Sequence, residues 1–340
     1  MKVLLISEDN NNNYTSIDRS FKNAFLELSN VELFSFNVPN ISNIQLINRI
    51  TARLPRVQSF HKRNVNKSLC EEVKTIRPDV IFIIKGASIF PESLETLKHQ
   101  FSQAIFICFN PDDPFNLASS NSDILQSIKF YDHYFIWTKR LIKPILESGA
   151  KQAHYIPFAS DTSLIYPNLK DTSLSFDLTF IGNGDSERQR WVDNIVDHLE
   201  KRNDIIKFSV FGKNWKKYKS LNLNGMRNGI DYLKCIGESK INVNFLRKQN
   251  KGSTNMRTFE IPAAGGFLMH EYSEEAMEIF KPDKEVVYFS STEELIDKSS
   301  FYLKNVKLRK QIISSGYKKA TALESTYLDR VRTILKRINN

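Results

Sequence analysis

Short apolar runs rich in Val, Ile and Phe alternate along the chain with longer stretches in which apolar residues recur every three or four positions. The runs are typical of strands in a parallel sheet that is covered on both faces, and the stretches are typical of amphipathic helices. In the first half of the chain the expected strands are 3–7, 31–36, 80–84, 104–109, 134–137 and 154–156. The expected helices between them are 16–29, 62–76, 91–101, 122–130 and 139–148.

A polar stretch without a clear period, residues 158–176, interrupts this pattern and is interpreted as a linker. A second alternating series follows it. The expected strands are 177–182, 207–212, 240–246, 266–270 and 286–289. The expected helices are 187–201, 230–239, 255–264, 273–280 and 292–303, with a C-terminal pair from residue 306 onward. The two series predict an α/β protein with two Rossmann-like domains, whose ligands bind at the carboxyl ends of the strands in a deep cleft between the domains.

The length of 340 residues is enough for two hydrophobic cores. We expect an N-terminal domain over residues 1–160, a C-terminal domain over 175–325, and a helix over 326–340 that packs back on the N-terminal domain. The three cysteines show no paired spacing, so neither a disulfide framework nor a zinc site is expected. The first residues lack the apolar core of an export signal, which predicts a cytoplasmic protein.

The formal net charge of +10 indicates an anionic partner, which can be a nucleotide diphosphate, a nucleic acid or an acidic membrane. The stretch from Leu33 to Cys70 contains no acid but several basic residues between Arg49 and Lys67. This region predicts peripheral association with the inner face of a membrane, although a solvated basic surface has the same composition. The basic residues are otherwise dispersed and form no nucleic-acid-binding motif, so no nucleic acid is expected.

The most informative stretch is 253–268, where a polar loop precedes a predicted helix that ends at a pair of glycines. Asn255 stands at the start of this helix, and Arg257 and Glu260 lie three positions apart on one face of it. A helix N-terminus with an arginine beside it suits a diphosphate, and a glutamate one turn deeper suits two ribose hydroxyls. An exposed ion pair on an amphipathic helix has the same spacing.

Asn255-Met256-Arg257-x-Phe259-Glu260-Ile261-Pro262-Ala263-x-Gly265 resembles the nucleotide-sugar motif of the CgeB-like (spore maturation protein CgeB) glycosyltransferases, which are of the GT-B type. Further similarity is found in 177–184, 210–215, 239–244, 280–286 and 290–295, and in the N-terminal half in 84–86, 109–114 and 155–161. The resemblance covers residues 80 to 330 and is most specific in the C-terminal part.

The resemblance implies a hexosyltransferase-like enzyme that takes a sugar from a nucleotide diphosphate donor and needs neither a metal nor another cofactor. It implies that Glu260 holds the ribose and that Arg257 faces the diphosphate. Many retaining GT-B enzymes carry two glutamates eight positions apart, and the first of these falls on Gly252 here. The stereochemical course therefore stays open. The expected acceptor is a glycan, a lipid-linked oligosaccharide or a protein, in the biosynthesis of a bacterial surface polysaccharide.

Other candidate donor contacts follow predicted strands. Gly182, Asn183 and Gly184 close one strand and open a helix, a place where the backbone can approach a phosphate, and Gly212 follows the next strand. Arg188 follows in the family pattern, and Arg247 ends a further predicted strand. Tight turns and solvated charges are the alternative interpretations of these residues.

The candidate catalytic carboxylates lie in the N-terminal half of the chain. Asp112 and Asp113 follow a predicted strand and lie between prolines, which fixes a turn that can aim one of them into the cleft as a general base. Glu8 or Asp9 also ends a strand and is a secondary candidate. An Asx turn is the structural alternative for the Asp112–Asp113 pair.

Two other functions remain possible on this sequence. A nonhydrolysing sugar-nucleotide epimerase has the same architecture, and a non-enzymatic basic protein that binds nucleotides or nucleic acid would have the same charge. A dinucleotide-dependent oxidoreductase is disfavoured because the first strand is followed by Glu8-Asp9 and asparagines instead of a glycine-rich turn.

Overall fold

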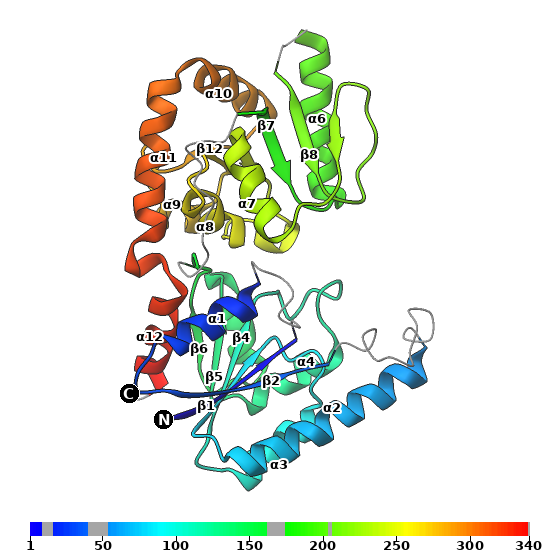
Figure 1. Cartoon of the computed structure of the whole chain (residues 1–340). Coiled ribbons are helices and arrows are strands. Elements are labelled where there is room, and N and C mark those ends of the chain that lie inside the picture. Colours follow the sequence, from blue (N-terminus) through cyan, green and yellow to red (C-terminus); the bar gives the residue numbers. More distant parts are fainter. Residues whose placement is uncertain (9–15, 40–53, 162–173, 203–205, 339–340) are drawn as a thin grey trace. The chain divides into compact units, whose positions relative to one another are not determined.

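The computed structural model describes residues 1–8, 16–39, 54–161, 174–202 and 206–338. They form two compact units, and each is an α/β layer structure built on its own sheet (Figure 1). The N-terminal unit is Met1–Pro157 together with Arg330–Asn340, and the C-terminal unit is Phe158–Asp329. Most of the expected linker lies outside the described residues, and so does the candidate residue Asp9. Within the described part of the linker, Ser160 pairs in a parallel β-bridge with Thr326.

The N-terminal unit contains a parallel six-stranded sheet in the order β2-β1-β3-β4-β5-β6. The strands are β1 (Lys2–Ser7), β2 (Glu32–Asn37), β3 (Val80–Ile84), β4 (Ile105–Asn110), β5 (His133–Ile136) and β6 (Ala153–Tyr155). The apolar runs of β1, β3 and β4 are buried almost throughout, as expected of central strands with helices on both faces.

Helices follow most of these strands: α1 (Ile17–Leu26), α2 (Pro55–Ile76), α3 (Pro91–Gln100), α4 (Ser122–Ser127) and α5 (Ile142–Glu147). The expected helix at 62–76 begins seven residues earlier, at Pro55. Proline is well suited to the first turn because its ring fixes φ and its missing N–H has no partner there. Helix α12 (Tyr327–Ile338) ends the described chain.

The C-terminal unit contains a second parallel six-stranded sheet, in the order β12-β11-β10-β7-β8-β9. The strands are β7 (Phe176–Ile181), β8 (Phe208–Phe211), β9 (Asn222–Asn224), β10 (Ser239–Asn244), β11 (Leu268–Glu271) and β12 (Val287–Phe289). Strand β9 was not predicted, because its sequence Asn-Leu-Asn is short and polar. It forms the edge of the sheet beside β8.

The helices of this unit are α6 (Ser186–Arg202), α7 (Gly229–Glu238), α8 (Met256–Ala263), α9 (Glu274–Ile279), α10 (Thr292–Lys304) and α11 (Val306–Thr321). Helix α8 contains Pro262 and ends directly after it. Gly265 adopts a positive φ of 74°, its N–H bonds to the carbonyl of Pro262, and the N–H of Gly266 bonds to the carbonyl of Ile261. These bonds form a Schellman motif, which explains the glycine pair.

The order of the strands reverses once in each sheet, between β1 and β3 in the first and between β7 and β10 in the second. Loops that leave neighbouring strands at such a point run to opposite faces, which leaves a crevice at the carboxyl ends. The two switch points are therefore where ligands are expected in each unit. Among the described residues, no helix combines the length and the apolar character needed to span a bilayer.

The loops after β7 and β8 pack backbone against backbone. A Cβ on Gly212, whose φ is 145°, would lie 2.1 Å from the carbonyl oxygen of Gly182. A Cβ on Gly184 would lie 2.3 Å from the carbonyl oxygen of Asn214. The glycines of this loop pair are thus required by their mutual approach.

Replacing Gly212 by alanine is expected to destabilise the protein by about 1–3 kcal/mol, because the new Cβ meets backbone at a φ that L residues rarely adopt. Thermal unfolding measures this change as a lower melting temperature. Gly225→Ala is the matched control, since nothing lies within 4 Å of its added Cβ. Equal melting temperatures for the two variants would contradict the close approach of the two loops.

Candidate functional site

Three arginines gather at the switch point of the C-terminal sheet. Arg188 comes from the first turn of α6, Arg247 from the segment after β10, and Arg257 from the first turn of α8. The Nε of Arg257 donates to the carbonyl of Ile181 at 2.7 Å, and its guanidinium lies over Gly182. All three residues were predicted as donor contacts, and the fold brings them together.

Arg188 is the most enclosed of the three, with only 3% of its surface exposed. It donates from Nη1 to the carbonyl of Asn183 and from Nε to that of Phe245, and its guanidinium lies over the ring of Phe180. Burial, followed by the charges of Arg257 and Arg247, lowers the pKa of Arg188 to about 9. The group stays charged at neutral pH, so the protein holds several like charges close together, as anion sites do.

Asp185 supplies part of the opposing charge. Its Oδ2 lies 3.5 Å from Nε of Arg247 and 3.7 Å from Nη1 of Arg188. Glu271, which ends β11, accepts from the N–H of Leu246 and forms an ion pair with Lys251. Arg247 is about half exposed, so its guanidinium can exchange Asp185 for a ligand at little desolvation cost.

A buried polar network fixes the N-terminus of α8. The amides of Asn244 and Asn255 form two reciprocal hydrogen bonds at 3.0 Å. Asn255 also caps α8 by accepting from the N–H of Thr258, whose hydroxyl accepts from the N–H of Asn255. This capping box holds the loop that carries Arg257 in one geometry.

His270 completes this network from β11. Its Nδ1 lies 2.5 Å from the carbonyl of Glu271, which can only accept, so Nδ1 carries the proton and Nε2 accepts from the hydroxyl of Thr258. Burial lowers the pKa of His270 to about 4, and the ring is neutral in the native protein.

Glu260 lies one turn further along α8 and is half-buried. Its Oε2 accepts from the hydroxyl of Tyr232, on α7, at 2.9 Å. Burial raises the pKa of Glu260, against the opposing effects of Arg257 and the Tyr232 hydroxyl. Tyr232 thus orients one carboxylate oxygen of Glu260.

The Gly182–Gly184 loop carries further candidate residues. Asn183 is exposed, and its side-chain oxygen accepts from the N–H of Lys213 in the loop after β8. The indole of Trp215 donates to the carbonyl of Gly182 and packs edge-on against Phe180. The two loops therefore form one rigid wall beside the arginines.

At the carboxyl edge of the N-terminal sheet, Glu8 accepts from the N–H of Ser88 at 2.7 Å. Asp112 forms a 2.8 Å ion pair with Lys85, a residue with a positive φ of 63°. Asp113 accepts from the N–H of Phe115, as in an Asx turn, and pairs with Arg140 at 3.0 Å. Glu8 therefore follows β1, which is one of the two switch-point strands. Asp112 follows β4, the neighbour of the other switch-point strand β3, while Asp113 is held by its turn.

Sequence reasoning did not single out Asp185, Glu271 or His270. Asp185 and Glu271 follow or end strands of the same sheet as the predicted residues, so the rule on carboxyl ends would have found them. His270 carried no such signal, because its role depends on contact with Thr258 across the fold.

The fold of the whole chain is GT-B, with two Rossmann-like units. Sucrose-phosphate synthase from Thermosynechococcus elongatus superimposes with a TM-score of 0.69 at 10% identity, covering 99% of this chain and 98% of the other. A glycosyltransferase from Rickettsia africae gives a TM-score of 0.65 at 14% identity, covering 100% and 98%. Anabaena HepE in complex with UDP gives 0.62 at 8% identity over the full length of both chains.

At the level of sequence, residues 188–336 match the family described as glycosyl transferase-like. This segment begins at Arg188 and includes the other two arginines and Glu260. No curated protein shows significant similarity to the sequence. The GT-B type of the expected resemblance is thus confirmed, whereas its CgeB-like branch stays a prediction.

Acidification is expected to destabilise the protein between about pH 6.5 and pH 4. The pKa of His270 is lowered to about 4 by burial, and that of His154 to about 4 by burial and by the charges of His133 and Arg337. The unfolded chain binds protons at these histidines near pH 6.5 and the native protein only near pH 4, so falling pH favours unfolding in this window.

The melting temperature measured from pH 7 to pH 4.5 tests this expectation. His270→Gln should melt lower than the natural protein at pH 7, because the hydrogen bond between the Thr258 hydroxyl and the imidazole is lost, but its melting temperature should fall less steeply with acid. An unchanged slope in this variant would show that the pKa of His270 is not lowered in the native protein.

Proposed function

We propose that this protein is a glycosyltransferase that moves a hexose from a nucleotide diphosphate-sugar to an acceptor. The observation that carries the proposal is the group of Arg188, Arg247 and Arg257 at the switch point of the C-terminal sheet, with Glu260 one turn along α8 from Arg257. The match of residues 188–336 to a glycosyl transferase-like family supports the same class.

In this proposal the diphosphate contacts Arg247 and Arg257, and the buried Arg188 adds its positive charge beside these two arginines. A nucleotide diphosphate is the leaving group of sugar transfer, and its negative charge grows as the bond to the sugar breaks. Guanidinium groups that are already fixed by the Ile181, Asn183 and Phe245 carbonyls need little rearrangement to stabilise that charge. The arginines supply the positive charge, so the proposed reaction needs no metal ion and no further cofactor.

Glu260 is the proposed ribose contact. A carboxylate can accept from both ribose hydroxyls, and the hydrogen bond from Tyr232 turns Glu260 into a single orientation. Gly182 to Gly184 and Gly212 form the wall beside the phosphates. UDP is the first nucleotide to test, since HepE was solved with UDP and a GT-B trehalose-6-phosphate protein from E. coli with UDP-2-fluoro glucose.

The acceptor is proposed to meet the N-terminal unit, where Asp112 and Glu8 are the candidate bases. Asp113 is the weaker candidate because its carboxylate is already engaged by Phe115 N–H and Arg140. We propose a glycan, lipid-linked or protein acceptor in bacterial surface polysaccharide synthesis in the cytoplasm.

A sugar-nucleotide epimerase remains the second candidate, because a UDP-GlcNAc 2-epimerase from Neisseria meningitidis shares the fold with a TM-score of 0.57 and 11% identity, covering 99% and 100%. An epimerase converts its nucleotide sugar without an acceptor, whereas transfer requires one. The neutral, enclosed His270 is bonded to Thr258 and Glu271 and is poorly suited to proton transfer.

Removing one arginine is expected to weaken nucleotide diphosphate binding. Arg247→Ala and Arg257→Ala should each lose about 1.5–3 kcal/mol of binding free energy, as charged hydrogen bonds do, which is roughly 10- to 150-fold in Kd. Isothermal titration calorimetry with UDP, and with GDP, dTDP and ADP if UDP does not bind, measures the loss.

Arg190→Ala is the matched control, because Arg190 is an exposed arginine of α6 that pairs with Glu187 instead of facing the cluster. The control should bind like the natural protein. Equal affinity of all three variants for the nucleotide diphosphate would refute the proposed diphosphate site.

We also propose that helix α2 holds the protein at an anionic membrane surface. Arg56, Phe60, Arg63 and Lys67 recur at helical spacing on its exposed side, and Phe60 is 65% exposed. Lys62 of the same region pairs with Asp123, and Arg49 and Arg53 lie outside the described residues. A basic stripe with an apolar side chain suits anionic headgroups.

Vesicles of phosphatidylglycerol and phosphatidylcholine should therefore retain the protein in a sedimentation assay at low salt. Arg63→Glu with Lys67→Glu should abolish retention, because each basic residue near the surface contributes about 1 kcal/mol. Lys307→Glu with Lys310→Glu makes the same change of charge on exposed positions of α11, and this variant should sediment with the vesicles as the natural protein does. Equal retention of both double variants would refute a role of α2.

A further inference from the structure

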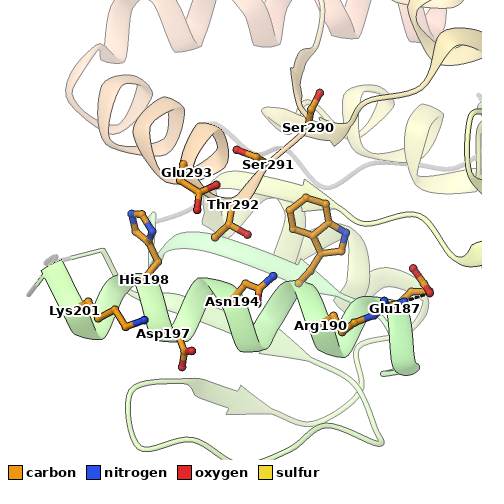
Figure 2. Close-up of a pocket in the computed structure, with 11 residues that line it drawn as sticks. Glu187, Arg190, Asn194, Asp197, His198, Lys201, Ser290, Ser291, Thr292 and Glu293 are labelled. Carbon is orange, nitrogen blue, oxygen red and sulfur yellow. Dashed lines mark hydrogen bonds and ion pairs between the residues drawn. The ribbon is translucent and has the colours of Figure 1, made fainter.

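A polar cavity of about 600 Å³ lies between α6 and the N-terminal end of α10 in the C-terminal unit. The helices pack on the same face of the sheet, and the cavity is lined by one side of α6 and by the turn that joins β12 to α10 (Figure 2). Its volume falls in the range of pockets that hold small ligands, roughly 300–1,000 Å³. The arginine cluster does not contribute to its lining.

The cavity contains an aromatic ring that is held rigidly. Trp191 stacks on Phe245 with ring centroids 5.5 Å apart and an angle of 11°, and Phe289 packs edge-on against it at 5.3 Å. One face of the indole is therefore covered by the core, while the side chain still lines the cavity. A fixed aromatic ring offers an apolar surface to the C–H groups of a ligand at low entropic cost.

Polar side chains surround this ring. Asn194 and His198 follow Trp191 at helical spacing on α6, and in Figure 2 His198 points toward Glu293 while Thr292 points down toward α6. Glu293 is held by its own N–H and by the Ser291 hydroxyl, which lower the pKa of its carboxyl. The cavity therefore offers amide, hydroxyl, imidazole and carboxylate groups within one space.

The charges of the lining exclude a strongly anionic ligand. Glu187 and Arg190 pair with each other at one end, and the remaining charged groups include both acids and bases. Among the described residues, the Nε2 of His198 has no hydrogen-bond partner in the protein. The lining contains three acids and two bases, so its net charge is small and negative. An aromatic surface with mixed donors and acceptors and a small net charge suits a neutral, polyhydroxylated molecule.

We propose that this cavity is a binding site for a neutral oligosaccharide, with a sugar ring on Trp191 and its hydroxyls on Asn194, Thr292 and Glu293. The site rests on the proposed function, since it takes the class of molecule that a glycosyltransferase elongates. Arg188 and Arg190 belong to the same turn of α6, one facing the arginine cluster and the other the cavity. The cavity thus holds a glycan beside the donor-binding part of the unit.

The test uses the full-length protein without nucleotide, titrated with maltotetraose, cellotetraose, chitotetraose and mannotetraose. Tryptophan fluorescence and calorimetry are expected to show saturable binding of at least one of them. Asn194→Arg, at an exposed position, fills the cavity and should weaken this binding by at least about tenfold. Glu200→Arg makes an exposed substitution on the same helix outside the cavity and should bind normally.

Absence of saturable binding by all four oligosaccharides overturns the proposal, as does unchanged binding by Asn194→Arg. Melting temperatures show that the variants are folded. UDP binding, measured on the same samples, separates this result from the proposed function. If UDP binds and no oligosaccharide does, the cavity assignment fails alone, and if oligosaccharides bind but no nucleotide does, the donor site fails alone.

Discussion

The C-terminal unit depends on bringing three guanidinium groups close together. Like charges at this separation repel one another, so each needs a fixed partner in the protein. Main-chain carbonyls at the ends of β7 and β10 hold Arg257 and Arg188, and Asp185 balances Arg247. The glycines of the adjoining loops, the cap of α8 and the Asn244–Asn255 pair all serve to keep this arrangement in place.

Much of this could be predicted from the sequence. Apolar runs and helical periods gave both sheets and their order of elements, because strands buried on two faces are continuous in hydrophobicity. Arg247 and Arg257 were predicted as donor contacts because they end a strand or open a helix, where ligands bind in α/β folds, and Glu260 because it lies one turn further along that helix. Arg188 was predicted from the family resemblance. A polar three-residue edge strand such as β9 has no such pattern and was missed.

What could not be predicted is how side chains far apart in sequence share partners. Tyr232 orients Glu260 through a hydrogen bond across α7 and α8, a contact that no local pattern indicates. Gly182 and Gly212 were assigned to phosphate approach, and the fold gives a second reason for them in the contact of one loop with the other. Asp112 and Asp113 are neighbours in the chain, yet they bind Lys85 and Arg140 separately.

The shortness of α8 fixes the spacing between the two proposed nucleotide contacts, Arg257 and Glu260. Arg257 and Glu260 stand on one eight-residue helix, closed by a capping box at one end and by the Gly265 turn at the other. Their separation along the axis is about 4.5 Å, set by the rise of an α-helix. Under the proposed roles this helix fixes the distance between the residue that contacts the ribose and the residue that contacts the diphosphate.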